Sequence, residues 1–173
     1  NHAGNALAQQ YYEQKFAALG YTTEAQAFNA TGRNVLVTKT GALYPEEIVV
    51  LCAHYDAMPS GTIYNAPAAD DDGSGCAAVL EAARILCDIP FERTIVFALW
   101  DQEEQGKIGS IYYANVMAAN DEEIVGVVNM DAIAFDGNGD RKARVHARQV
   151  ANSMAIADTV FAVLDRYALD VDL

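Results

Sequence analysis

Residues 68–86 read AADDDGSGCAAVLEAARIL, which is three consecutive aspartates, a Gly-Ser-Gly turn and an apolar run at helical spacing. The adjacent carboxylates of Asp70, Asp71 and Asp72 repel one another, so the fold must stabilise them. The start of a helix does so in part, through its free N–H groups and the positive end of its dipole. A bound dication would do so far more strongly. The segment alone therefore leaves two interpretations open, a heavily capped helix N-terminus or a metal-binding loop.

The composition is that of one globular domain. The chain has 173 residues, of which 52% are hydrophobic and 20% are charged, so it can bury a sizeable core. Its formal net charge of −13 argues against nucleic acid and against an anionic membrane surface as partners. No apolar run is long enough to span a membrane, and no signal peptide is visible. The chain opens at Asn1 without a methionine, so we expect that its original N-terminus was removed, and the sequence leaves its compartment unknown.

The three cysteines do not form a recognisable motif. Cys52, Cys76 and Cys87 show neither a C-x-x-C pair nor the spacing of a zinc knuckle, and an odd count does not suggest a disulfide framework. Each lies in an apolar run, so we interpret all three as buried, unreactive thiols.

Apolar runs of strand length alternate with helical patterns along the chain. The expected strands are residues 34–40, 47–54, 94–100 and 124–131, and the expected helices are residues 4–19, 74–87, 107–117 and 149–167. The last three strands are nearly unbroken apolar runs, which is typical of strands buried on both faces. This alternation predicts an α/β domain with a largely parallel central sheet.

Two details of this assignment are specific enough to test. In the first helix, we expect Leu7, Tyr11, Phe16 and Leu19 to form one buried face, with Gly20 ending the helix. Residues 57–67 are rich in Pro, Ser, Gly and Asn, and we expect them to form a loop.

Polar residues gather where the predicted buried strands end. His54 and Asp56 close one strand, Glu103 and Glu104 follow the next, and Asp131 closes the third. The triple aspartate follows the first of these strands. Ligands of open α/β sheets bind outside the carboxyl ends of the strands, so these segments should converge at one edge. Taken singly, a histidine at a strand end is more often a packed residue, and Glu-Glu in a loop is more often solvated.

One imidazole among several carboxylates favours zinc, manganese or cobalt and disfavours a thiolate-bound metal. Concentrated carboxylates also suit two ions about 3.5–4 Å apart, because a shared aspartate can bridge them. Asp56 stands two residues after His54 and could accept the second N–H of its imidazole.

Four blocks of the sequence then resemble a known family. They are HYD at residues 54–56, ADDDGSG at 69–75, WDQEEQGKIGS at 100–110 and VNMD at 128–131. Together and in this order they resemble the signature blocks of the co-catalytic di-zinc aminopeptidases. That family includes the bacterial leucyl-type aminopeptidases, and its relatives are the glutaminyl cyclases and glutamate carboxypeptidase-like proteins. The likeness covers nearly the whole chain and implies a three-layer α/β/α fold with a largely parallel central sheet.

The resemblance also implies a set of metal ligands. His54, Asp71 and Asp131 would hold one Zn²⁺ ion, and Asp71 would bridge to a second ion that Glu104 also binds. The family supplies the last ligand of the second ion from a histidine in a later segment. After Asp131 the one histidine here is His146, which lies where the family does not place that ligand.

We therefore interpret residues 1–173 as one partial zinc-peptidase catalytic domain whose C-terminal part is missing. One zinc ion, or none, is then expected in this chain, against two in a complete active site. The absent segment would leave an apolar sheet edge or helix face exposed, so self-association is expected.

The function that the resemblance implies is metal-dependent hydrolysis of N-terminal residues from peptides. Glu103 would take a proton from a zinc-activated water, and Asp56 would support His54. The partner would be a peptide with a free N-terminus, and the family favours a secreted or periplasmic location. Two alternatives stay open, a glutaminyl-peptide cyclase and a peptidase-like binding module without catalysis. The activity of the chain by itself is also left open.

Overall fold

The structure is a computed structural model that describes residues 2–59 and 65–169. The predicted loop at 57–67 is therefore described only at its two ends, which contain neither helix nor strand. The chain divides into two compact units, Asn1–Ala132 and Ile133–Leu173. Among the described residues, the first unit contains the sheet and three helices, and the second contains one helix. The prediction of a single partial domain over residues 1–173 stays a prediction.

From residue 44 onward the order of elements alternates between strands and helices, as expected. The first unit contains α1 (His2–Ala18), β1 (Thr23–Ala27), β2 (Arg33–Lys39), β3 (Tyr44–His54), α2 (Gly73–Leu86), β4 (Arg93–Trp100), α3 (Ile108–Ala119) and β5 (Glu123–Asn129), and the second contains α4 (Ser153–Tyr167). None of the described helices combines the length and the apolar character that a membrane crossing requires.

The five strands form one mixed sheet in the order β1-β2-β4-β3-β5. β3 pairs in parallel with both β4 and β5, whereas β2 pairs antiparallel with β1 and β4. The helices α2 and α3 provide the crossovers that parallel pairing requires, and the short β1–β2 turn (residues 28–32) allows only an antiparallel hairpin. The parallel half of the sheet ends at His54, Trp100 and Asn129, which brings the polar strand ends to one edge.

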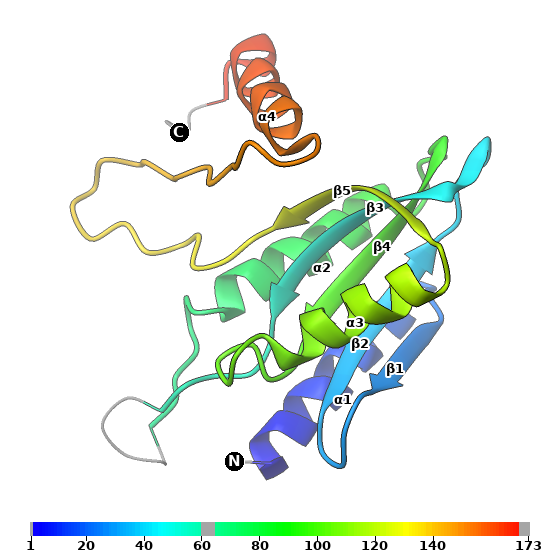
Figure 1. Ribbon diagram of the computed structural model, residues 1–173. Coiled ribbons are helices and arrows are strands. Elements are labelled where there is room, and N and C mark those ends of the chain that lie inside the picture. Colours follow the sequence, from blue (N-terminus) through cyan, green and yellow to red (C-terminus); the bar gives the residue numbers. More distant parts are fainter. Residues whose placement is uncertain (1, 60–64, 170–173) are drawn as a thin grey trace. The chain divides into compact units, whose positions relative to one another are not determined.

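Helices cover both faces of the sheet, so the predicted three-layer α/β fold is confirmed (Figure 1). On one face, α1 and α2 bury Phe16, Val79 and Ala83 against β2 and β4. On the other face, α3 buries Tyr113 beside Val50, Trp100 and their neighbours. Each central strand therefore needs apolar side chains on both sides, which explains the unbroken apolar runs of β3 and β4.

The buried face of α1 differs from the prediction. Phe16 is fully buried and Leu19 packs against the core, but the side chains of Leu7 and Tyr11 are 67% and 51% exposed. Ala8 and Tyr12 occupy the inward positions instead, eight and four residues before Phe16 on the same helix face. The helix ends before Gly20, whose φ of 88° is the left-handed conformation expected after a helix.

The outer strands also depart from the prediction. β1 was not expected, because its sequence TEAQA has one β-branched residue, Thr23, and no aromatic residue. β5 was expected to be a strand buried on both faces, and this was wrong. It lies at one end of the sheet, its burial is complete only at Gly126, and Val127 is 51% exposed.

All three cysteines are free thiols. Cys52 and Cys76 are buried, and burial raises the pKa of each thiol to about 12, so both are unreactive as expected. Cys87 is only half-buried, so the prediction that it is a core thiol was wrong. It lies directly after α2, where the helix reaches the surface.

Candidate metal centre

The last residue of the triple aspartate is the structural centre of the site. Asp72 is 1% exposed and caps α2 by accepting the backbone N–H of Gly75 at 3.1 Å. The same carboxylate accepts the N–H of His54 at 2.9 Å and that of Ala132 at 3.2 Å. One side chain thus joins the end of β3, the start of α2 and the segment after β5. The helix-cap interpretation of this segment is therefore correct for Asp72.

Close packing at the start of α2 requires a glycine at residue 75. A Cβ atom on Gly75 would lie 2.2 Å from the carbonyl oxygen of Met130 and 2.4 Å from Oδ1 of Asp72. The helix start therefore lies directly against the residues that precede Asp131. This contact brings the aspartate loop and the end of β5 to the same point.

The imidazole of His54 is oriented by Asp56. Its Nδ1 lies 3.1 Å from the carbonyl oxygen of Asp56 and 3.5 Å from Oδ1 of the same residue. A carbonyl oxygen can only accept, so Nδ1 carries the proton in this hydrogen bond. That leaves Nε2 facing Asp71, whose Oδ1 is 3.1 Å away. A histidine held in this way presents a lone pair on Nε2 to a metal ion.

Three predicted ligands converge at this point. One ligand atom from each of His54, Asp71 and Asp131 lies within 4.8 Å of the other two. His54 is buried and the two aspartates are exposed, so the group is open on one side. One imidazole nitrogen and two carboxylate oxygens are the donor set of a three-ligand zinc site with an open position. The residues present therefore fit a zinc ion.

The charges around His54 favour a cation at this point. Burial lowers the pKa of the imidazole, but the hydrogen bond to Asp56 and the charges of Asp72 and Asp56 outweigh it and raise the pKa to about 9. Burial also raises the pKa of Asp72 to about 6, although hydrogen bonds from His54 and Ala132 oppose that shift. The negative field that stabilises an imidazolium would also stabilise a dication.

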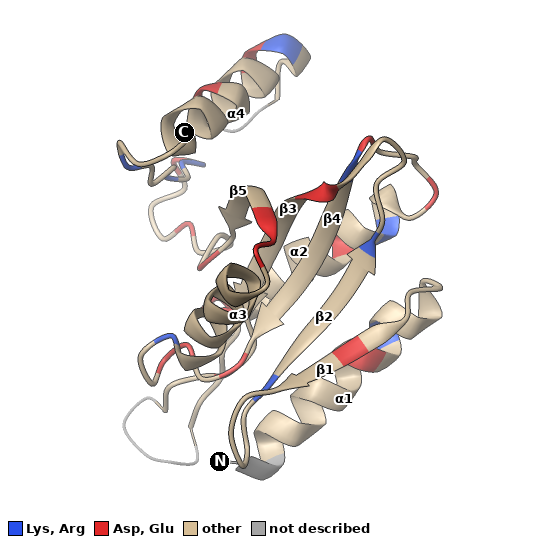
Figure 2. Cartoon of the chain, turned by 45° about the vertical axis from the view of Figure 1, so that its right-hand side comes forward, with Lys and Arg blue, Asp and Glu red and all other residues tan. Residues whose placement is uncertain are grey.

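Asp56 also holds the loop between β4 and α3, which we call the acidic loop (residues 101–107). Its Oδ1 accepts the backbone N–H of Glu103 at 2.9 Å, and its Oδ2 accepts that of Glu104 at 3.2 Å. Figure 2 shows acidic residues in the loop that leads into α3. Asp56 therefore links the predicted general base to the predicted histidine ligand.

The predicted ligand Glu104 is not a member of the group of three. Burial raises the pKa of its carboxyl above the usual value, and the charge of Asp71 raises it further. Glu104 is thus electrostatically coupled to Asp71, the residue that was predicted to bridge two metal ions. His146 lies in the second unit and does not belong to the group either.

The sequence did not reveal the structural role of Asp101, nor the bonds that Asp72 makes to His54 and Ala132 beyond the helix cap. Asp101 is 1% exposed, and its carboxylate accepts the backbone N–H groups of Arg33 at 2.9 Å and Gln102 at 2.8 Å, as well as the side-chain amide of Asn5. The only sequence signal was their position, one beside the predicted ligand Asp71 and one directly after a buried strand. Their partners come from distant segments.

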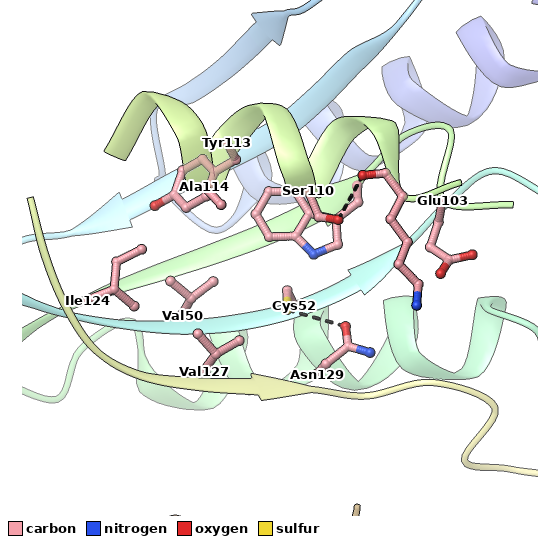
Figure 3. A pocket seen from close by; sticks show the side chains of 11 residues that line it. Val50, Cys52, Glu103, Ser110, Tyr113, Ala114, Ile124, Val127 and Asn129 are labelled. Atoms are coloured by element: carbon pink, nitrogen blue, oxygen red, sulfur yellow. Dashed lines mark hydrogen bonds between the residues drawn. The ribbon is translucent and has the colours of Figure 1, made fainter. Parts of the chain in front are cut away.

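A pocket of about 350 Å³ adjoins the acidic loop on the α3 face of the sheet. Figure 3 shows Glu103 and Asn129 at one end and Tyr113 and Ile124 at the other. Its walls are mostly apolar, and the thiol of Cys52 donates to Oδ1 of Asn129 at 3.3 Å. The lining contains Glu103 but none of the three candidate ligands, so this pocket is separate from the metal centre.

Comparison with known proteins places these features in a family. The model of peptidase family M28 matches residues 34–170. Leupeptin-inactivating enzyme 1 from Streptomyces exfoliatus is 36% identical over 143 residues, which are 79% of this chain and 31% of that protein. Aminopeptidase YwaD from Bacillus subtilis is 36% identical over 114 residues, 65% of this chain and 22% of that protein. The chain thus spans about a third or less of these relatives.

Solved structures share the fold. A Zn-dependent exopeptidase from Parabacteroides distasonis superposes with a TM-score of 0.74 at 18% identity, covering 95% of this chain and 65% of that one. Glutaminyl cyclases, one from Fimbriiglobus ruber and one from Bacteroides thetaiotaomicron, superpose with TM-scores of 0.69. At 22% and 18% identity these two show a common fold and do not separate the two chemistries.

Proposed function

Because this chain belongs to peptidase family M28, we propose that its metal centre serves a zinc-dependent exopeptidase that removes N-terminal residues from peptides. The observation that carries the proposal is the convergence of His54, Asp71 and Asp131, with one ligand atom from each within 4.8 Å of the others. The name of the Bacillus subtilis relative, an aminopeptidase, supports the same reaction.

Each residue of the site has a separate role in the proposed reaction. His54, Asp71 and Asp131 would hold a zinc ion, and such an ion supplies Lewis acidity toward a peptide carbonyl and lowers the pKa of water to about 7. Glu103 is the general base, which takes a proton from the attacking water and passes it to the leaving amine. Asp56 fixes the proton of His54 on Nδ1 and holds the backbone of Glu103.

In the complete protein, Asp71 and Glu104 would hold a second ion. The support for this is the charge of Asp71, which contributes to the raised pKa of Glu104, because a dication would relieve the repulsion between the two carboxylates. The exposed carboxylates also give the site the sign of charge that attracts the α-ammonium group of a peptide. This charge accounts for a preference for free N-termini.

Replacing the general base tests the proposal. In the complete, zinc-loaded protein, Glu103→Gln should lower kcat for an N-terminal aminoacyl substrate by about 1,000-fold, because an amide cannot take up the proton. Zinc content should not change. Glu122→Gln removes the same charge at an exposed position and serves as the control. Near-normal turnover by Glu103→Gln would show that Glu103 is not the base.

Glutaminyl cyclisation is the second candidate, because bacterial glutaminyl cyclases share this fold. In that reaction the α-amine of an N-terminal glutamine attacks its own side-chain amide, and ammonia leaves. Mass spectrometry of a peptide with N-terminal glutamine separates the two reactions. Loss of the whole residue supports the peptidase, and loss of ammonia from an intact peptide supports the cyclase. If zinc is bound and neither product forms, a binding module is supported.

A further inference from the structure

The acidic loop contains a backbone conformation that its residue type does not favour. Gln102 stands directly before the proposed base Glu103 and has a φ of 58°, the left-handed region that glycine adopts at the least cost. Its side chain is nevertheless large, and the residue is only 6% exposed. A glutamine at such a position indicates that its side chain makes contacts that a glycine could not provide.

Those contacts connect the acidic loop to the β1–β2 turn. Oε1 of Gln102 accepts the side-chain amide of Asn29 at 2.8 Å, and Nε2 donates to Oγ1 of Thr31 at 3.3 Å. The backbone of Gln102 is bonded as well, since its N–H donates to Asp101 at 2.8 Å and its carbonyl accepts the N–H of Ile108 at 3.0 Å. Both ends of the side-chain amide and both backbone groups are therefore in use.

The β1–β2 turn is itself well ordered by hydrogen bonds. Oδ1 of Asn29 accepts the backbone N–H groups of Thr31 at 2.9 Å and Gly32 at 2.6 Å, which fixes the side-chain amide toward Gln102. Arg33 donates from Nη1 to the carbonyl of Asn29 at 2.8 Å, and its backbone N–H binds Asp101 at 2.9 Å. The turn and the first residue of β2 thus bind two consecutive residues of the acidic loop, Gln102 and Asp101.

The loop is held from its other flank by Asp56, which accepts the N–H groups of Glu103 and Glu104. The carbonyl of Glu103 accepts the N–H groups of Gly106 at 2.9 Å and Lys107 at 2.7 Å. We propose that Gln102 is a positioning residue, whose amide joins the β1–β2 turn to the acidic loop and so fixes the backbone of Glu103 against Asp56. This inference rests on the proposed function, because it assigns Glu103 the role of base.

We call the hydrogen bonds between Gln102 and the β1–β2 turn the clamp. Two variants break the clamp without straining the backbone. Gln102→Gly removes the amide at a residue whose φ suits glycine. Asn29→Asp keeps the Oδ1 acceptor of the turn but replaces the donor that faces Gln102 with an oxygen. Asp121→Gly is the control for the first variant, because Asp121 also has a left-handed φ, of 60°, but lies beyond the far end of α3. Asn115→Asp, at an exposed residue of α3, is the charge control for the second.

Amide hydrogen exchange in this chain measures how far the clamp protects the backbone N–H groups of the acidic loop. Both clamp variants should speed exchange at Glu103 and Glu104 about 10-fold, and the double variant should match the single ones, because the residues act as one unit. Both controls should exchange like the unmodified chain. Unchanged exchange rates in the acidic loop, or additive effects in the double variant, would show that the clamp does not hold this loop as one unit.

Kinetics of the complete zinc-loaded protein measure the effect of the clamp on the proposed base, Glu103. Gln102→Gly should lower kcat about 10-fold while KM changes less than about twofold and zinc content stays constant. An unchanged kcat beside faster loop exchange would overturn the positioning role. Absence of peptidase activity in the unmodified protein would contradict the proposed function instead, and the exchange measurement would still decide whether the clamp exists.

Discussion

The carboxylate of Asp72 accepts the backbone N–H of His54 at 2.9 Å, and this bond connects the helix that follows the aspartate loop to the strand that carries the imidazole. Oδ1 of Asp72 accepts the N–H groups of Gly75 and Ala132, so both carboxylate oxygens accept backbone hydrogen bonds. The site is thus organised by a buried residue that does not belong to the candidate ligand group.

Asp72→Asn should destabilise the chain. An amide can satisfy the donors on one side only, and its NH₂ group would face a buried N–H on the other, which costs about 1–3 kcal/mol. Chemical denaturation should show this as a lower midpoint with an unchanged slope. Asp88→Asn makes the same change at an exposed residue and should alter stability by less than about 0.5 kcal/mol. Equal stability of the two variants would contradict the role of Asp72.

Gly75→Ala should disturb the site even though alanine favours helices. The added Cβ would meet the carbonyl of Met130 at 2.2 Å, so the start of α2 must move away from the strand end beside Asp131. We expect a loss of about 1–3 kcal/mol of stability and weaker zinc binding, measured by denaturation and titration. Ala77→Gly, at an exposed position of α2, should cost about 1 kcal/mol without affecting zinc. Normal zinc affinity of Gly75→Ala would count against this packing argument.

Asp56→Asn should impair catalysis by the complete protein more than it impairs folding. The amide would leave the N–H of Glu103 or Glu104 without an acceptor and would weaken the orientation of His54. Changes to such supporting residues lower activity or metal affinity about 10- to 100-fold. Steady-state kinetics and zinc analysis measure both effects, with Asp88→Asn again as control. Full activity of Asp56→Asn would mean that the link between His54 and the acidic loop is dispensable.

The exposed edge of the sheet should make this chain self-associate. β5 is the end strand of the sheet that the described residues form, and the side chain of Val127 is 51% exposed there, so an apolar group is available for contact with another chain. Sedimentation should show a concentration-dependent increase in mass, and Val127→Lys should reduce it by placing a charge on the edge strand. Ala118→Lys, at an exposed position of α3 that does not line the pocket beside Val127, is the control for added charge. Association that Ala118→Lys reduces as much as Val127→Lys would show that the edge is not responsible.

The sequence predicted the parts of the fold that depend on local pattern. The apolar runs of β3 and β4 and the helical spacing of α2 were assigned correctly because both faces of these strands are covered. β5 has a similar composition, but the burial of a strand depends on what lies beside it in the sheet, and a strand's own residues do not encode that. β1 was missed because its pairing with β2, and not its residue types, makes it a strand.

The residues of the site likewise fall into those that the sequence could predict and those that it could not. The convergence of His54 and Asp131 with the triple aspartate could be predicted because parallel strands bring their carboxyl ends to one edge, and the family resemblance then singled out Asp71. The bonds that Asp72 makes beyond the helix cap and the role of Gln102 could not, since their partners are backbone or amide groups from distant segments such as Ala132 and Asn29. Hydrogen bonds of this kind leave no spacing signal in the sequence.

The most direct test of the metal centre is a zinc titration of this chain by calorimetry. We expect one ion per chain, bound by His54, Asp71 and Asp131, with the site of Asp71 and Glu104 poorly occupied because it has two carboxylates and no imidazole. His54→Ala and Asp131→Ala should each weaken binding by at least about 100-fold, more than the loss of a supporting residue. Zinc binding by His54→Ala with the affinity of the unmodified chain would contradict the account.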